Sequence, residues 1–360
     1  MATLRKIRDV VIYRDACYNS FPNVARMSNG DLLVAFRHAA DWQTEFGRVQ
    51  HIDPGSIALI VRSRDEGSTW SEPSVLHDDY LYGVQDPCLN VLGDGTVLAT
   101  CFLWKVAEIG EVDEIGERSG YTRQIGDRYA AKRIGIVTKR STDNGKTWDR
   151  AASLGYGQLA LRGNGAELPD GSFLVAAYTE GLDHLFVAKT TDKGLSWSPQ
   201  GAIAKPADNF LNETHLYRTE SGKLVAFIRS QIQDERLPAE KRSPLFTSES
   251  FDDGRTWSEP QQHAVYGPTP FHTIRLASGR VLLTYGYRLK PHGLRARLLD
   301  PECKRIEEAD EIVLRDDGPG MDIGYSHAVQ LPDGRILIVY YFYDRADGRR
   351  YIAGTWCEEI

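Results

Sequence analysis

Side chains that could do chemistry recur at one fixed distance from a set of repeated glycines. The positions nine residues before these glycines hold Phe21, Asp86, Arg162, Glu213, Pro270 and Tyr325. Carboxylates, a guanidinium and a phenol can transfer protons, bind anions or attack a substrate, whereas a structural strand would more often carry small or apolar residues. The spacing predicts a site to which several repeats each contribute one residue, with Asp86 and Arg162 in substrate binding. A channel filled by hydrogen-bonded polar groups is the alternative.

Two further positions relative to the same glycines carry polar side chains. Arg37 and Arg229 lie seven residues after a glycine, and a guanidinium offers a rigid two-point match to a carboxylate, such as that of an acidic sugar. Either arginine could instead be a solvated residue at a strand end. His215, His272 and His327 lie seven residues before three consecutive glycines. Three imidazoles from adjacent repeats could hold a divalent metal, but we favour hydrogen bonds to substrate hydroxyls or to one another, with no cofactor required.

The glycines that define these positions each follow a polar residue and precede an apolar run. They are Gly30, Gly95, Gly171, Gly222, Gly279 and Gly334, which lie 65, 76, 51, 57 and 55 residues apart. A polar residue followed by Gly between β-rich segments is typical of a hairpin, and each interval is long enough for four strands. The pattern predicts an all-β chain, a six-bladed β-propeller of four-stranded antiparallel blades. The strand before each glycine should be the innermost one and line the central channel.

A second repeat, [Ser/Thr]-x-Asp-x-Gly-x-[Ser/Thr]-Trp, occurs four times. Its copies occupy 63–70, 141–148, 190–197 and 250–257. Asp can accept hydrogen bonds from backbone N–H groups in a tight turn, Gly supplies a positive φ, and Trp covers the outside of a hairpin. We expect one copy in each of the first four blades and a decayed copy near 298–303.

The two ends of the chain complete the ring in this interpretation. The sixth repeat is too short for four strands, and the strand-like run 6–13 is the candidate to fill the missing place, which would remove a free sheet edge. We treat 1–360 as one domain. Residues 107–132, rich in Glu, Arg and Gly, should form a long inserted loop in the second repeat, which either covers the mouth of the site or decorates the surface.

Composition limits the partners and the location of the protein. No apolar run is long enough for a signal peptide or a membrane span, which favours a soluble, cytoplasmic protein without membrane contact. The net charge of -7 gives no reason to expect nucleic acid as a partner. The cysteines lack metal-ligand spacing and are expected to be reduced, mostly buried thiols. Nothing in the sequence indicates an oligomeric state.

The four copies of the Asp-containing repeat resemble the Asp boxes, or BNR repeats, of the sialidase (neuraminidase) superfamily. Tyr325, within Gly-Tyr-Ser, resembles the family's tyrosine nucleophile. Glu213, followed by a strand, a Ser-Gly turn and Arg229, resembles the glutamate partner and one of three carboxylate-binding arginines. Asp53 stands where the family keeps its acid/base aspartate, with Asp41 as a rival. The resemblance implies that Glu213 takes the proton of Tyr325 while Asp53 protonates the leaving oxygen.

The chain departs from the family pattern at the arginines. Near the chain start sialidases carry Arg-Ile-Pro, whereas this sequence has Ser20 in the place of that arginine, before Phe21 and Pro22. For the third arginine, Arg288 and Arg295 are both candidates. Each charge-assisted hydrogen bond lost from such a clamp is worth about 1.5–3 kcal/mol, so sialic acid itself is disfavoured as the substrate.

Three functions are consistent with these residues. The first choice is a sialidase-like glycoside hydrolase that acts on a non-reducing terminal sugar of an oligosaccharide or glycoconjugate, an acidic sugar if Arg229 is a clamp. The alternative is a polysaccharide lyase on a uronate-containing glycan, in which Tyr325 and a nearby His pass the proton and Arg or a metal neutralises the carboxylate. A non-catalytic carbohydrate-binding propeller is the third. A lyase leaves an unsaturated, ultraviolet-absorbing uronate, and a binding protein tolerates loss of Tyr325.

Overall fold

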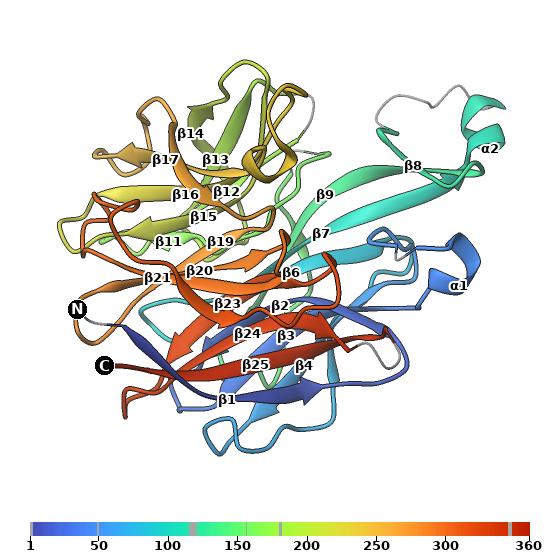
Figure 1. The fold of residues 1–360 in the computed structure, drawn as a ribbon. Helices are drawn as coiled ribbons and strands as arrows, with labels where there is room; N and C mark the ends of the chain where they lie inside the picture. Colours follow the sequence, from blue (N-terminus) through green and yellow to red (C-terminus); the bar gives the residue numbers. More distant parts are fainter. Residues whose placement is uncertain (1–2, 49, 115–120, 156, 180–181, 345–347) are drawn as a thin grey trace.

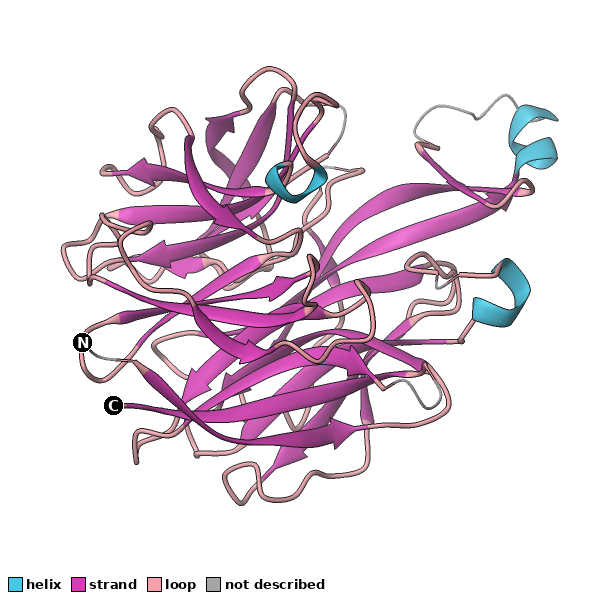
Figure 2. Ribbon diagram, in the orientation of Figure 1, coloured by secondary structure: helices cyan, strands magenta, loops and turns pink. Residues whose placement is uncertain are grey.

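Strands in six separate sheets form the framework of the molecule, and loops and turns connect them (Figures 1 and 2). The computed structural model describes residues 3–360 apart from 49, 115–120, 156, 180–181 and 345–347. Within this part of the chain, helix is confined to α1 (Gln43–Phe46), α2 (Ile109–Glu114) and a 3-10 turn at Ala239–Lys241. The predicted fold class, a six-bladed β-propeller, is confirmed.

Each blade is an antiparallel sheet whose first strand in the chain is its innermost one, except that the last blade borrows its outermost strand from the N-terminus. Blade one contains β2 (Tyr18–Arg26), β3 (Leu32–Ala39), β4 (Ile57–Ser63) and β5 (Ser74–His77). Blade two contains β6 (Gly83–Val91), β7 (Val97–Glu108), β9 (Tyr129–Ser141) and β10 (Ala152–Ser153), with β8 (Arg123–Ile125) paired to β9. Blade three contains β11 (Ala166–Glu167), β12 (Phe173–Ala177), β13 (His184–Thr190) and β14 (Ser198–Ala204).

The remaining blades follow the same order. Blade four contains β15 (Asn209–Arg218), β16 (Leu224–Ile232), β17 (Pro244–Ser250) and β18 (Gln261–Tyr266). Blade five contains β19 (Phe271–Arg275), β20 (Val281–Tyr287), β21 (Gly293–Leu299) and β22 (Ile312–Arg315). Blade six contains β23 (Gly324–Gln330), β24 (Ile336–Tyr343), β25 (Arg350–Glu359) and β1 (Leu4–Tyr13).

The N-terminal strand closes the ring as predicted. β1 pairs antiparallel with β25, from Leu4 opposite Glu359 to Tyr13 opposite Ile352, so the two ends of the chain lie side by side (Figure 1). The pairing covers the edge that β25 would otherwise expose. Closure by chain ends also fixes the first and last blades relative to each other, and the innermost strands of these two blades, β2 and β23, contact each other.

Apolar side chains fill the spaces between neighbouring blades. Leu33 and Ile60 of blade one, for example, pack with Leu89 and Leu103 of blade two in one buried cluster. Each blade therefore buries its faces against its neighbours rather than around a single centre, as expected of a repeat fold. The axis itself is lined by the innermost strands, where polar residues gather.

The four Asp boxes share one set of hydrogen bonds at the edge of each blade. In the first box, Ser63 Oγ accepts from the Gly67 backbone N–H at 2.7 Å, and Asp65 Oδ1 accepts from the Thr69 N–H at 2.9 Å. Gly67 has φ of 80°, and a Cβ there would lie 2.7 Å from the Trp356 ring of blade six. The glycine is thus required both by its backbone conformation and by its contact with the preceding blade.

The described part of residues 107–132, expected as an inserted loop, extends a hairpin. β7 and β9 continue well beyond the blade, and α2 and β8 lie at the far end of this arm (Figure 1). A Cβ on Gly126 would lie 3.7 Å from the ring of Phe46 in α1. The arm therefore packs beside the β3–β4 connection, which also carries Asp53.

Two other expectations concern the chain as a whole. All five cysteines are free thiols, four of them buried and Cys17 half-buried, as predicted. Of the helices that the structure describes, none has the length and apolar character needed to span a membrane.

Candidate active site

Backbone bulges hold the side chains of four innermost strands at the axis. Phe21, Asp86, Glu213 and Tyr325, all nine residues before a turn glycine, have φ of 55°, 50°, 31° and 55°. This left-handed conformation is rare outside Gly and costs about 1–3 kcal/mol per residue. The pairing with the second strand of the blade shifts register at the same four points. Because a bulge re-aims a side chain, one irregularity repeated in four blades directs these residues to a common centre.

Tyr325, Glu213 and Arg229 form one hydrogen-bonded group at this centre. The Tyr325 hydroxyl donates to Glu213 Oε1 at 2.6 Å, and Arg229 Nη1 donates to the Tyr325 hydroxyl oxygen at 2.9 Å and also to Glu213 Oε2. Tyr325 and Glu213 are only 4% and 6% exposed. The phenol therefore has a carboxylate that can accept its proton and a guanidinium that can stabilise the resulting phenolate.

Burial and charge give the two acids of this group different protonation states. Burial, together with the charge of Glu213, raises the pKa of Tyr325 well above its usual value. Burial also acts to raise the pKa of Glu213, but the charge of Arg229 and the hydrogen bonds from Tyr325 and Arg229 outweigh it and lower that pKa. Tyr325 is thus neutral and Glu213 ionised at neutral pH, the combination in which a carboxylate can activate a phenol.

Arg162 packs on the Tyr325 ring, with its Cζ 5.3 Å from the ring centroid. Its guanidinium donates to the backbone oxygens of Phe21 at 3.3 Å, Pro22 at 2.7 Å and Pro87 at 3.3 Å. These carbonyls belong to the innermost strands of blades one and two. Arg162 was predicted to bind substrate, but in the structure its donors tie the first two blades together beneath the ring of Tyr325.

Of the two candidates for a third arginine, the structure places only Arg288 at the site. Its Cζ lies 5.4 Å from the Tyr325 ring centroid, and its guanidinium donates to the Ile323 backbone oxygen at 2.9 Å and to the Tyr341 hydroxyl. Arg295 lies within blade five instead. It stacks on Tyr287, with Cζ 4.3 Å from the ring centroid, and donates to backbone carbonyls of its own blade.

Arg37 is among the largest side chains that the fold buries completely. Its three guanidinium nitrogens make no hydrogen bond with the residues that the structure describes. It lies opposite Ser20 on the neighbouring strand, and the Ser20 hydroxyl also lacks a partner within that part of the chain. Unmet donors in a buried position are costly, so Arg37 is available to bind acceptor atoms of a ligand.

Asp53 is fixed by the connection between β3 and β4. It is 3% exposed, and both carboxylate oxygens accept hydrogen bonds at 2.8 Å, Oδ1 from the Gly55 N–H and Oδ2 from Trp42 Nε1. Gly83, at the start of β6, packs against the same residue, because a Cβ there would lie 1.8 Å from the Asp53 backbone oxygen. Burial lowers the pKa of Arg37, and the negative charge of Asp53 acts against this lowering.

The rival of Asp53 lies at the beginning of α1. Asp41 is partly exposed, and its Oδ1 accepts a hydrogen bond from the Gln43 N–H at 3.1 Å. This is a local turn interaction. The structure therefore favours Asp53 over Asp41 as the carboxylate of this connection that faces the centre.

Asp322 is a buried carboxylate at the site that sequence reasoning missed. Its oxygens accept hydrogen bonds at 2.8–2.9 Å from four groups: the hydroxyls of Tyr18 and Tyr341, His51 Nε2 and Arg350 Nε. Burial acts to raise the pKa of Asp322, but the charges of His51, Arg350 and Arg288 hold it far below its usual value. The donors come from distant parts of the chain, so the only sequence signal is the position of Asp322 three residues before Tyr325.

The three histidines lie together, as their common register predicted. The His272 and His327 rings stack with centroids 3.4 Å apart, and His215 meets His272 edge-on at 4.7 Å. Asn164, at the equivalent position of blade three, donates its backbone N–H to His215 Nδ1 at 3.3 Å and bonds His327 Nε2 through its side chain at 2.5 Å. Burial lowers the pKa of His215 to about 4 and those of the other two well below the usual value, so all three are neutral.

Metal binding by these histidines stays a prediction. Their rings are stacked, whereas metal ligands converge on one point from different directions. Among the residues that the structure describes, the group of three His, Cys, Asp or Glu side chains whose ligand atoms all lie within 4.8 Å of one another is Asp15, Cys17 and His38. Within that group, Asp15 Oδ1 already accepts hydrogen bonds from the Cys17 N–H at 2.9 Å and from Asn19 at 2.7 Å.

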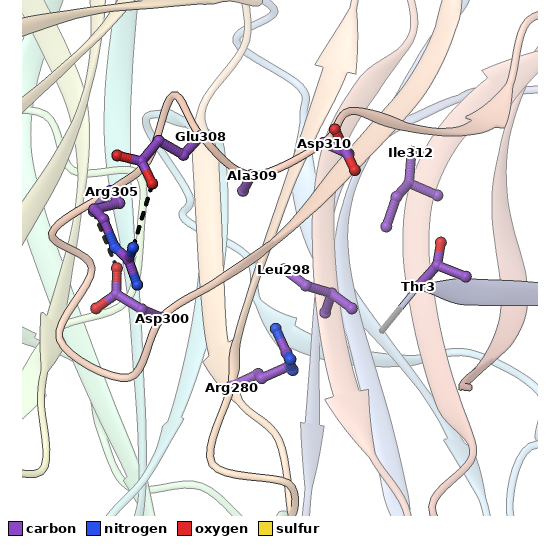
Figure 3. Close-up of a pocket in the computed structure, with 9 residues that line it drawn as sticks. All are labelled: Thr3, Arg280, Leu298, Asp300, Arg305, Glu308, Ala309, Asp310 and Ile312. Carbon is purple, nitrogen blue, oxygen red and sulfur yellow. Dashed lines mark hydrogen bonds and ion pairs between the residues drawn. The ribbon is translucent and has the colours of Figure 1, made fainter. Parts of the chain in front are cut away.

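A separate pocket lies on the outer part of blade five, next to the N-terminus (Figure 3). Its lining includes Arg280, Asp300 and Arg305, and Arg305 pairs with Glu308 at 3.4 Å. None of the residues that line this pocket belongs to the Tyr325 group. The decayed fifth Asp box contributes here through Asp300, whose carboxylate still accepts backbone N–H groups of its turn.

Comparisons with known proteins agree with this architecture. No curated protein matches the sequence. A protein of unknown function from Dyadobacter fermentans DSM 18053 is 33% identical over 99% of both chains, with a TM-score of 0.86. The K499G mutant of NanB sialidase from Streptococcus pneumoniae is 16% identical, with a TM-score of 0.66 over 97% of this chain and 70% of that one. The α-L-arabinanase of Penicillium chrysogenum is 14% identical over 98% of both chains, with a TM-score of 0.67.

The identities to the sialidase and the arabinanase are low, so these two structures show a shared fold and no more. The family model for the BNR repeat-like domain matches residues 121–338, which is more than half of the chain. That segment contains three of the four Asp boxes and both Glu213 and Tyr325. The chain therefore belongs to the BNR repeat-like domain family.

Proposed function

We propose that this protein is a glycoside hydrolase that removes a non-reducing terminal sugar, with Tyr325 as the nucleophile and Glu213 as its base. The observation that carries the proposal is the buried group in which the Tyr325 hydroxyl donates to Glu213 and accepts from Arg229. The similarity in fold to a sialidase and an arabinanase supports the broader class, since both names describe enzymes that cleave glycosides.

The geometry suits a two-step reaction with retention of configuration. In the first step, Glu213 takes the phenolic proton while the Tyr325 oxygen attacks the anomeric carbon, and Arg229 stabilises the negative charge that develops on that oxygen. A neutral phenol avoids the cost of a second buried anion beside Glu213. The leaving oxygen needs a proton from another acid. The buried carboxyl groups of Asp53 and Asp86 are the two candidates for this general acid.

The charges around Tyr325 favour a sugar other than sialic acid. Arg229 is already paired with Glu213, and Arg288 lies beside the ionised Asp322. Ser20 supplies no charge where sialidases have their first arginine. Arg37 is the guanidinium with unmet donors, so we propose that it binds hydroxyl or other acceptor oxygens of the terminal sugar.

A panel of chromogenic glycosides and uronate polysaccharides tests the proposal, with wild type and Tyr325→Phe compared on every compound. Hydrolysis by the wild type that is lost in the variant is the expected result. Formation of an unsaturated, ultraviolet-absorbing product would identify a lyase instead. Binding of sugars without turnover, unchanged in Tyr325→Phe, would identify a carbohydrate-binding protein. The lyase alternative is less favoured because the hydrogen bonds of the Tyr325 hydroxyl go to Glu213 and Arg229, whereas His215 and His327 bond Asn164.

A further inference from the structure

We infer that Asp86, in place of Asp53, gives a proton to the leaving oxygen and later takes one from the attacking water. The inference deepens the proposed function and rests on it, because a leaving oxygen exists only if the protein cleaves a glycoside. Asp86 was expected from the sequence only to bind substrate. Its position, its unpaired oxygen and its charge environment together indicate proton transfer.

The backbone places Asp86 in the same way as the nucleophile pair. It lies nine residues before the turn glycine of blade two, at the bulge of β6, with φ of 50°. Glu213 and Tyr325 hold the equivalent bulge positions in blades four and six. Residues at equivalent positions of different blades converge on the axis, and the charge of Glu213 acts on the pKa of Asp86 there.

One oxygen of Asp86 has no hydrogen-bond partner. The residue is 2% exposed, and its Oδ1 is buried without a hydrogen bond to any residue that the structure describes. A buried carboxyl oxygen left unpaired is unfavourable unless a ligand completes it. Oδ1 of Asp86 is therefore available for a hydrogen bond with a substrate atom.

The surroundings of Asp86 and Glu213 give these two carboxyl groups different pKa values. Burial raises the pKa of Asp86 to about 7; the charges of Arg162, Arg37 and Arg229 act against this rise, and the charge of Glu213 adds to it. The pKa of Glu213 is lowered, because Arg229 pairs with it. A protonated acid beside an ionised carboxylate is the pairing that glycosidases use to run acid and base chemistry at one pH.

Asp53 has the opposite character. Both of its oxygens accept hydrogen bonds from N–H donors, Gly55 on one side and Trp42 on the other. These hydrogen bonds occupy the oxygen lone pairs that a leaving oxygen would need. Asp53 therefore holds the β3–β4 connection in place, close to the charge of Arg37, and is a positioning residue.

Protons and bonds balance in both steps. The Tyr325 oxygen bonds to the anomeric carbon as Glu213 takes the phenolic proton, the bond from the anomeric carbon to the leaving oxygen breaks, and the carboxyl proton of Asp86 passes to that oxygen. In the second step the Asp86 carboxylate takes a proton from water as the water oxygen bonds to the anomeric carbon. The bond to Tyr325 breaks, and Glu213 returns its proton to the phenolate.

Leaving-group dependence distinguishes an acid from a positioning residue. The probes are the methyl glycoside and the 2,4-dinitrophenyl glycoside of whichever sugar the wild type hydrolyses. Only the methyl glycoside needs a proton on its leaving oxygen. Asp86→Asn should lower kcat/KM on the methyl glycoside by about 10²–10⁴-fold and leave that on the dinitrophenyl glycoside within about tenfold, since general acid catalysis contributes this much. Asp53→Asn, the matched control, should affect both probes equally.

A second measurement uses the wild type alone and does not depend on the folding of a variant. With the methyl glycoside, kcat/KM should fall as the pH rises through about 7, where Asp86 loses its proton, and this fall should be absent with the dinitrophenyl glycoside. A leaving-group-dependent loss in Asp53→Asn, or an alkaline fall that is the same for both probes, would overturn the assignment of Asp86. Full turnover in Tyr325→Phe would instead overturn the proposed function itself.

Discussion

Replacing Asp86 with Asn should stabilise the protein more at high pH than at low pH. Burial raises the pKa of Asp86 from 3.8 to about 7 in the folded protein. A group whose folded pKa is raised contributes stability that is fully present below its unfolded pKa and is lost as the pH rises through the folded pKa. The wild type thus loses stability from this carboxyl group between roughly pH 4 and pH 7, whereas Asn has no proton to lose.

The size of the effect follows from the difference between the two pKa values. A difference of about 3 units at 1.36 kcal/mol per unit corresponds to about 4 kcal/mol in total. Between pH 5 and pH 8, about 2–3 kcal/mol of this should be lost by the wild type and retained by Asp86→Asn. This range lies on the pH scale where most proteins can be unfolded reversibly by urea without acid denaturation of the native state.

The assay is urea unfolding of wild type and variant at pH 5 and pH 8. The difference in unfolding free energy, variant minus wild type, should be larger at pH 8 by the amount above. Asp53→Asn is the matched control, because that buried carboxyl group, unlike Asp86, has N–H donors on both oxygens. A difference for Asp86→Asn that does not change between the two pH values would refute the reasoning, since it would mean that Asp86 is ionised at both.

Three further outcomes are expected. Tyr325→Phe should lower kcat by about 10³-fold or more with little change in substrate binding by calorimetry, because the aromatic ring remains and the attacking oxygen is gone; retained turnover would exclude the nucleophile role. Gly83→Ala should lower Tm and activity, because its Cβ would lie 1.8 Å from the Asp53 backbone oxygen, whereas Gly110→Ala, with nothing within 4 Å, should do neither; equal Tm values would contradict that contact. Protein purified without a His tag should contain no stoichiometric divalent metal and should stay active after chelation, because the neutral histidine rings stack; bound metal, or activity lost on chelation, would support a metal site at His272.

The repeats in the sequence were enough to predict the blades and much of the site. Each turn glycine marks a hairpin between the first and second strands, so counting residues from it identifies the innermost strand without any alignment. That register brought Tyr325, Glu213 and Asp86 to one centre, and the position seven residues after the glycine added Arg229. The prediction worked because in a propeller the same position in every blade lies at the same distance from the axis.

Sequence reasoning could not show the contacts that side chains make between blades. Arg162 holds the predicted position, yet its guanidinium binds backbone carbonyls of Phe21, Pro22 and Pro87, and no local pattern can show which acceptors a long side chain will reach. Asp322 lies outside any strand register, and its four donors come from the start of β2, from the segment after β3 and from blade six. The expected loop at 107–132 contains strand and helix in its described part, because β7 and β9 continue past the end of the blade and α2 and β8 lie between them.

The backbone at the axis explains why blades three and five differ from the other four. A side chain re-aimed by the bulge requires positive φ, which Pro270 of blade five cannot adopt because its ring fixes φ near −65°. In blade three the positive φ of 123° belongs to Gly163, the residue after Arg162, and a Cβ there would lie 2.3 Å from the Thr214 backbone oxygen of blade four. In blade three the glycine therefore lets the chain after Arg162 approach the innermost strand of blade four. Arg162 itself links the innermost strands of blades one and two through hydrogen bonds. The other four blades carry the positive φ on a residue with a side chain, the apolar Phe21 in blade one and Asp86, Glu213 and Tyr325 in blades two, four and six. The closed ring of six blades keeps those strained positions in place.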